Sequence, residues 1–289
     1  IILKATIPII ILPLIFIFSI TIIEMKAAAP SKVKGLLKSP SCIFSMSLIS
    51  LSVLGGNINE LYYICDGGNE LWRVNRINGN TTQITKGKWD VIEFLGVNEK
   101  SNTIYFTAAK KGPLHKGIYS IKMDGSTLKA ISKETGTNGA DFSNGMSYFI
   151  KRYSNANTPT VYSLCDNTGK EIEILETNNR LNTTLRSYKM STKLFVTFQG
   201  HEHELNGFMI KPPNFDKTKK YPTLLYCQGG PQSALTQSYS FRWNFQLMAA
   251  NGYIIIAPNR RGMPGYGVEW NEQISTNYGG QNMDDYLSA

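Results

Sequence analysis

Residues 222–257 read PTLLYCQGGPQSALTQSYSFRWNFQLMAANGYIIIA, and this stretch decides the architecture of the C-terminal third of the chain. The short apolar run 222–227 predicts a strand. Apolar residues at helical spacing predict a helix over 241–251, which Gly252 ends. Residues 253–257 are wholly apolar, as in a strand of a sheet buried on both faces. A strand, a helix and a strand with short connections predict a βαβ unit with parallel strands.

The sequence just before this unit predicts a β-hairpin. Residues 194–198 and 205–210 are two apolar runs separated by a polar turn, and the polar segment 211–220 follows them. We therefore expect the chain to change architecture near residue 193.

Working further towards the N-terminus, residues 60–177 contain a repeat of short strands. Three units begin near Leu61, Ile104 and Tyr148, about 43–44 residues apart, and each holds three predicted strands. Each unit has a turn glycine, at Gly79, Gly125 or Gly169, where a tight hairpin needs a positive φ. A period of ~40–45 residues is typical of β-propeller blades, although an ordinary β-meander would also fit. A propeller has about four to eight blades, so three units predict an incomplete one.

The first 58 residues do not fit either pattern. Residues 7–23, IPIIILPLIFIFSITII, are almost wholly apolar, and a second apolar run follows at 42–54. The first run is at the short limit of a membrane span and longer than a typical signal-peptide core. We assign residues 1–58 to a signal-like or anchor-like segment, or to mispredicted sequence outside the fold. Membrane anchoring through residues 7–23 would make the protein exported or membrane-anchored, on the periplasmic or extracellular side.

Composition excludes several classes of site. The chain has 30 Lys and Arg against 21 Asp and Glu, but the cations are scattered and not interleaved with aromatic residues, so no nucleic-acid partner is expected. None of the four cysteines forms a C-x-x-C pair, and those in apolar runs are expected to be buried free thiols. The sequence His201-Glu202-His203-Glu204 is expected in an exposed turn rather than in a metal site. No metal and no cofactor are predicted.

Several short motifs occur in an order that resembles a known family. Gly229-Gly230-Pro231, Ala-Asn-Gly-Tyr at 250–253, Pro-Asn-Arg-Arg-Gly at 258–262 and Gly-Tyr-Gly at 265–267 resemble the start of the peptidase domain of the prolyl oligopeptidase family. Residues 83–87, 136–138 and 154–159 are similar to late blades of its dipeptidyl peptidase IV-like branch. The resemblance covers residues 60–289. It implies a mixed fold, with a partial β-propeller (59–192) followed by the N-terminal part of an α/β-hydrolase domain (193–289).

Serine hydrolysis on this fold needs a Gly-x-Ser-x-Gly elbow, then an acid, then a histidine. The chain has no such elbow, and its three histidines all precede the predicted hydrolase strands. We therefore expect the catalytic triad beyond residue 289, and an incomplete, inactive fragment that starts at Ile1 and stops at Ala289.

The resemblance leaves one candidate for catalysis in this chain. The side chain before Gly-Gly-Pro points at the oxyanion in the family, where it is commonly Tyr in the dipeptidyl peptidase IV branch, and here it is Gln228. A glutamine amide can donate a hydrogen bond to an oxyanion, although a turn-stabilising role is equally open. Gly229, Gly230 and Pro231 would shape the turn beside it.

Arg260 and Arg261 follow the predicted buried strand, and we expect them to form structural ion pairs. No role is assigned to Asp284 and Asp285. The function implied is a serine peptidase that releases short peptides from N-termini through an acyl-enzyme, with peptides as substrates and a homodimer left open. The alternatives are a non-catalytic propeller binding protein with a degenerate hydrolase half, and an acylaminoacyl-releasing or esterase-type hydrolase.

Overall fold

The computed structural model describes residues 60–64, 70–75, 77–200, 202–229, 234–240, 245–275, 277 and 279–289. The expected signal or anchor segment 1–58, including 7–23, lies outside the described residues. In the described part of the chain, no helix is long and apolar enough to cross a membrane.

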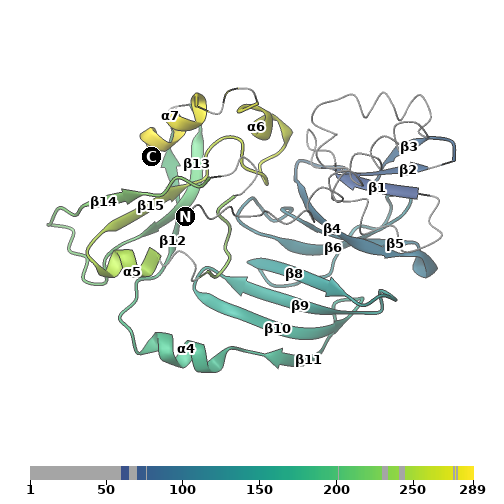
Figure 1. Ribbon diagram of the computed structural model, residues 1–289, viewed down its shortest axis with the longest axis horizontal. Coiled ribbons are helices and arrows are strands. Elements are labelled where there is room, and N and C mark those ends of the chain that lie inside the picture. The colour runs from purple at the N-terminus through teal and green to yellow at the C-terminus, as the bar shows by residue number, and fades with distance from the viewer. Residues whose placement is uncertain are drawn as a thin grey trace, which may run out of the picture.

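The first part of the molecule consists of three antiparallel sheets formed by strands consecutive in sequence (Figure 1). The first sheet contains β1 (Glu60–Ile64), β2 (Leu71–Asn75) and β3 (Thr81–Gln83). The second contains β4 (Val91–Asn98), β5 (Thr103–Ala108), β6 (Gly117–Lys122) and β7 (Lys129–Ala130), with the 3-10 turn η1 (Glu99–Ser101) between its first two strands. The third contains β8 (Thr137–Phe142), β9 (Tyr148–Asn155), β10 (Thr158–Asp166) and β11 (Glu171–Glu176).

The predicted repeat is confirmed, but its starting strand is corrected. The second and third sheets each begin one strand earlier than predicted, with β4 and β8. The turn glycines do adopt the predicted conformation, with φ of 72° at Gly79, 83° at Gly125 and 88° at Gly169. Each sheet therefore resembles one propeller blade, and the described sheets do not close into a ring.

The sheets pack face to face because side chains alternate along each strand. In β5, Ile104 and Phe106 enter a core shared with the first sheet, together with Tyr62 and Leu71. The intervening Tyr105 enters a second core, shared with the third sheet. The second sheet is thus buried on both faces, which fixes the order of the three sheets.

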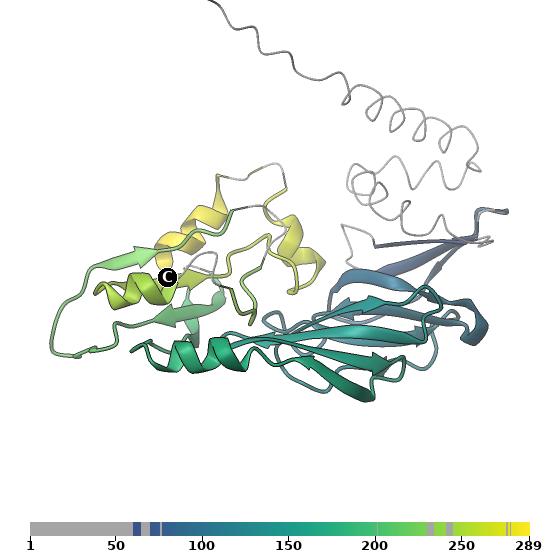
Figure 2. The same cartoon turned by 60° about the horizontal axis from the view of Figure 1, so that its bottom comes forward.

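The second part of the molecule is a mixed sheet covered by short helices (Figure 2). The helix α4 (Asn179–Arg186), which the sequence did not predict, precedes it. The sheet has the order β12 (Leu194–Gln199), β13 (Glu204–Ile210), β15 (Ile254–Pro258), β14 (Thr223–Leu225). The helices are α5 (Phe245–Ala250), α6 (Val268–Glu272) and α7 (Gln281–Ser288).

The predicted hairpin and βαβ unit are confirmed. Strands β12 and β13 pair antiparallel, and β14 pairs with β15 in parallel. Phe245 and Ala249 of α5 pack on Ile255 and Ala257 of β15. The expectation that residues 253–257 are buried on both faces is only partly met: β15 is an inner strand with Ile255 and Ala257 buried, but Ile254 and Ile256 are partly exposed.

Hydrogen bonds join the two parts across a buried contact. Asp90, which precedes β4 and is 1% exposed, accepts hydrogen bonds from the main-chain N–H groups of Gly265 and Gly267. The main-chain N–H of Gln237 donates to the carbonyl of Leu114 (2.9 Å). The main-chain N–H of Tyr239 donates to the Ser154 hydroxyl (3.2 Å). Segment 234–240 therefore lies against the second and third sheets.

Candidate functional site

Gln228 lies just beyond the C-terminal end of β14, and two tyrosines hold it there. The Tyr226 hydroxyl donates to its side-chain Oε1 (2.9 Å), and the Tyr286 hydroxyl donates to its main-chain carbonyl (3.1 Å). Its Nε2 donates to the carbonyl of Gly229 (3.2 Å). The side chain is thus held by Tyr226, just after β14, and the backbone is held separately by Tyr286 of α7.

The turn after Gln228 is described only in part. A Cβ added at Gly229 would meet no described atom within 4 Å, so the described part of the chain gives no steric reason for glycine there. Gly230 and Pro231 lie outside the described residues. Whether these three residues shape an active-site turn stays a prediction.

Asn259, which is fully buried just after β15, binds the main chain of Leu235. Its Oδ1 accepts a hydrogen bond from the main-chain N–H of Leu235 (2.7 Å), and its Nδ2 donates to the Leu235 carbonyl (3.0 Å). Because β14 and β15 run parallel, Gln228 and Asn259 lie at the same edge of the sheet. This C-terminal edge is where α/β proteins place their ligands.

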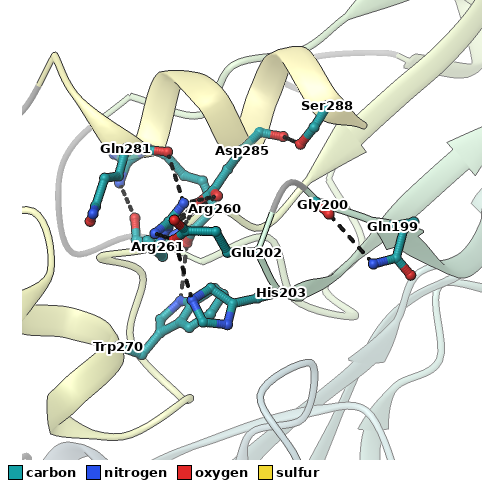
Figure 3. A network of polar contacts seen from close by, with 10 residues as sticks. All are labelled: Gln199, Gly200, Glu202, His203, Arg260, Arg261, Trp270, Gln281, Asp285 and Ser288. Atoms are coloured by element: carbon teal, nitrogen blue, oxygen red, sulfur yellow. Dashed lines mark hydrogen bonds and ion pairs between the residues drawn. The ribbon is translucent and has the colours of Figure 1, made fainter.

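Arg261 forms the centre of the network drawn in Figure 3. Its side chain is 2% exposed, and its guanidinium binds both oxygens of Asp285, with N–O distances of 2.8 Å to 3.0 Å. Its main-chain N–H also donates to Asp285 (2.8 Å), and its Nη1 pairs with Glu202 (2.7 Å) at the surface. The hydrogen bonds to Asp285 raise the pKa of the guanidinium. One arginine thus joins the end of β15, the helix α7 and the β12–β13 turn.

Arg260 and Tyr286 continue this cluster towards Gln228. The Arg260 guanidinium lies 5.9 Å from the centre of the Tyr286 ring, within the range of a cation–π contact. The Trp270 indole N–H donates to the Arg260 carbonyl (3.1 Å). Burial raises the pKa of the Tyr286 hydroxyl, so this hydroxyl stays protonated and can donate to Gln228 at neutral pH.

The other residues considered from the sequence take structural places. Glu202 and His203 lie in an exposed turn, His201 is outside the described residues, and no group of described His, Cys, Asp or Glu side chains could hold a metal ion. Cys165 is buried and free as expected. Cys227 is exposed, contrary to expectation, because it lies beyond the end of the edge strand β14.

Two family descriptions match separate parts of the chain. Residues 45–160 match the "Dipeptidyl peptidase IV (DPP IV) N-terminal region", and residues 239–289 match the "Prolyl oligopeptidase family". Among curated relatives, "Dipeptidyl-peptidase 5" of Porphyromonas gingivalis is 40% identical over 190 residues, which are 65% of this chain and 27% of the relative. "Probable dipeptidyl-aminopeptidase B" of Arthroderma benhamiae is 33% identical over 73% of this chain and 24% of the relative.

This chain belongs to the prolyl oligopeptidase family, in its dipeptidyl peptidase IV-like branch. It spans about a quarter of the length of these curated relatives. Among solved structures, that of Porphyromonas gingivalis dipeptidyl peptidase 4 superposes with a TM-score of 0.74 at 30% identity, over 84% of this chain and 35% of that protein. The fold is accordingly a partial β-propeller followed by the N-terminal part of an α/β-hydrolase domain, as the sequence predicted.

Within this family framework, the residues that the sequence analysis missed are those that hold Gln228. Asp285 was assigned no role, yet it is 1% exposed and bound to Arg261. The contact from Tyr286 could not be predicted, because only the folded chain brings a residue of α7 next to the end of β14, whereas Tyr226 is two residues from Gln228 in sequence. One signal in the sequence was available. A helix over these residues turns neighbouring side chains to different sides, so Asp284 and Asp285 cannot both face solvent equally, and the aromatic Tyr286 indicates that the buried face includes Asp285.

Proposed function

We propose that the chain is part of a longer serine peptidase of the dipeptidyl peptidase type, which releases short peptides from the N-termini of peptide substrates. Family membership supports a peptidase, and the matched stretches make up only about a quarter of each relative, which supports a larger protein. On this proposal the nucleophilic serine, the acid and the histidine lie beyond residue 289, and the 289-residue chain alone is inactive.

The chemistry proposed for this chain is stabilisation of an oxyanion. When a serine attacks a peptide carbonyl, negative charge develops on the carbonyl oxygen, and hydrogen-bond donors fixed beforehand stabilise it most. The Gln228 amide is such a donor. The observation that carries the proposal is that both the backbone and the side chain of Gln228 are held, at the C-terminal edge of two parallel strands.

The propeller sheets are proposed to limit access to this edge. The segment 234–240 follows the Gln228 turn and is hydrogen-bonded to Leu114 and Ser154 of the second and third sheets. A substrate at Gln228 would therefore lie near the junction of the two parts. Access limited in this way favours short peptides over folded proteins.

An acylaminoacyl-releasing or esterase-type hydrolase is the alternative, and a non-catalytic binding protein is a second. Export or membrane anchoring, supported by the apolar run 7–23, and homodimerisation are also proposals.

The test compares two proteins, the 289-residue chain and the natural protein that contains it. Each is incubated with a dipeptide arylamide, with the same compound acetylated at its N-terminus, and with a simple acyl ester. A fluorophosphonate probe, which labels reactive serines, is applied in parallel.

We expect the longer protein to cleave the dipeptide arylamide, to prefer it over the acetylated form and to take the label, and the 289-residue chain to do none of these. Preference for the acetylated compound or the ester would instead indicate the alternative hydrolase. Absence of both hydrolysis and labelling in the longer protein would contradict a peptidase and favour the binding protein.

A further inference from the structure

Two neighbouring residues of α7 connect the Arg261 network to Gln228. Asp285 binds Arg261, and Tyr286 donates its hydroxyl hydrogen to the main-chain carbonyl of Gln228. Asp285 and Tyr286 are 1% and 5% exposed, so both lie on the buried face of the helix. The contact to Gln228 therefore depends on where α7 sits.

Arg261 determines that position more firmly than apolar packing alone could. A guanidinium and a carboxylate that share two parallel hydrogen bonds define both a distance and an angle. Here the main-chain N–H of Arg261 adds a further bond to Asp285, and its Nη2 reaches the carbonyl of Gln281 (3.4 Å), one turn earlier in α7. Translation or rotation of α7 would break these bonds together.

Arg261 itself is fixed by its neighbours. It follows β15 by three residues, and its Nη1 is bound to Glu202 in the β12–β13 turn. The position of α7 is thus set by the same sheet that ends in Gln228. The contacts thus run from the sheet through Arg261 and Asp285 to Tyr286 of α7, and from Tyr286 back to the Gln228 carbonyl at the end of the sheet.

We propose that the Arg261–Asp285 pair positions Gln228 for catalysis through the hydroxyl of Tyr286. This inference rests on the proposed function, and it makes Arg261, Asp285 and Tyr286 positioning residues rather than catalytic ones. A displacement of ~1 Å in a catalytic group can cost about 100-fold in rate. Loss of one positioning hydrogen bond should have a smaller but measurable effect.

The test uses the longer natural protein and the substitution Tyr286→Phe, which removes only the hydroxyl and keeps the ring against Arg260. Tyr221→Phe is the matched control. The Tyr221 hydroxyl also contacts main-chain groups, those of Asn214 and Asp216, but it lies before β14, at the end opposite to Gln228. Both variants are measured in the wild-type background and in a Gln228→Ala background, with kcat, KM and melting temperature recorded.

We expect Tyr286→Phe to lower kcat three- to tenfold with KM changed less than twofold, and to have no further effect in the Gln228→Ala background. Tyr221→Phe should leave kcat unchanged in both backgrounds. Arg261→Lys, which keeps the charge but not the paired hydrogen bonds, should show the same kcat loss and the same dependence on Gln228.

An unchanged kcat in Tyr286→Phe, or an equal loss with and without Gln228, would overturn the positioning role while leaving the peptidase intact. A wild-type protein that cleaves no dipeptide arylamide would overturn the proposed function, and this inference with it.

Discussion

Asp284 and Asp285 are adjacent carboxylates in one helix, and they differ in what surrounds them. Asp284 is exposed, whereas Asp285 is 1% exposed and neutralises the buried Arg261. Removing one partner of a buried ion pair leaves the other charge without compensation, which is far more costly than losing a surface charge. Which aspartate matters is therefore a question of burial rather than of residue type.

Asp285→Ala should lower the free energy of unfolding by about 3–5 kcal/mol, because the buried charge of Arg261 would keep only an ion pair with the half-exposed Glu202. Asp284→Ala, in the first turn of the same helix, should cost about 1 kcal/mol or less. Urea denaturation of both variants measures the difference. Equal effects would mean that Arg261 does not depend on Asp285.

At the scale of the element, the turn glycines explain how the strands of each sheet are joined. Gly125 and Gly169 occupy equivalent turns with nearly equal φ, 83° and 88°. A Cβ at Gly125 would lie 3.0 Å from the carbonyl oxygen of Ile84, whereas one at Gly169 would lie 2.4 Å from the carbonyl oxygen of Ile131. The two turns thus carry similar strain in φ but different crowding against the preceding sheet.

Gly125→Ala should destabilise the protein by about 1 kcal/mol, and Gly169→Ala by about 2–3 kcal/mol, since a backbone carbonyl cannot move aside as a flexible side chain can. Thermal unfolding of the two variants gives the comparison. A larger loss of stability in Gly125→Ala than in Gly169→Ala would contradict the closer approach of the Gly169 turn to the neighbouring sheet.

Most strands that the sequence predicted are short apolar runs bounded by turn residues, whereas polar residues or glycine interrupt the missed strands β4 and β8. Strand β4 contains two register irregularities, near Glu93 and Gly96, which interrupt its period of two. Strand β8 reads TNGADF, so only Ala140 and Phe142 bring apolar side chains to the core, and the strand pairs with β9 along its whole length. Gln228 could be identified from its motif, but its partner Tyr286 is 58 residues away in sequence, and no local pattern indicates that contact.

At the scale of the whole molecule, Asp90 joins the propeller sheets to the hydrolase part. Its buried carboxylate accepts hydrogen bonds from the main-chain N–H groups of Gly265 and Gly267, in the hydrolase part. Gly265 also lies close to Pro113, since a Cβ there would be 3.1 Å from the Pro113 Cα. The two parts are therefore expected to unfold together.

Asp90→Ala should cost about 1–3 kcal/mol, because one buried and one partly buried N–H lose their acceptor, and Asp90→Asn should cost less because one acceptor oxygen remains. Asp141→Ala, which breaks only the exposed ion pair with Arg152, should change stability by less than about 1 kcal/mol. Calorimetry should show a lower melting temperature and separated transitions only for Asp90→Ala. A single, unshifted transition would contradict the coupling.

The most direct test of the account as a whole is the kcat of Gln228→Ala in the longer natural protein, with a dipeptide arylamide as substrate. Loss of one oxyanion donor costs about 100- to 1000-fold in kcat in other hydrolases, and we expect a fall of that order with little change in KM. Gln83→Ala, the same substitution in β3 of the propeller, is the control and should retain full activity. A Gln228→Ala variant with kcat within twofold of the wild type would contradict the assignment of this chain as the oxyanion side of a serine peptidase.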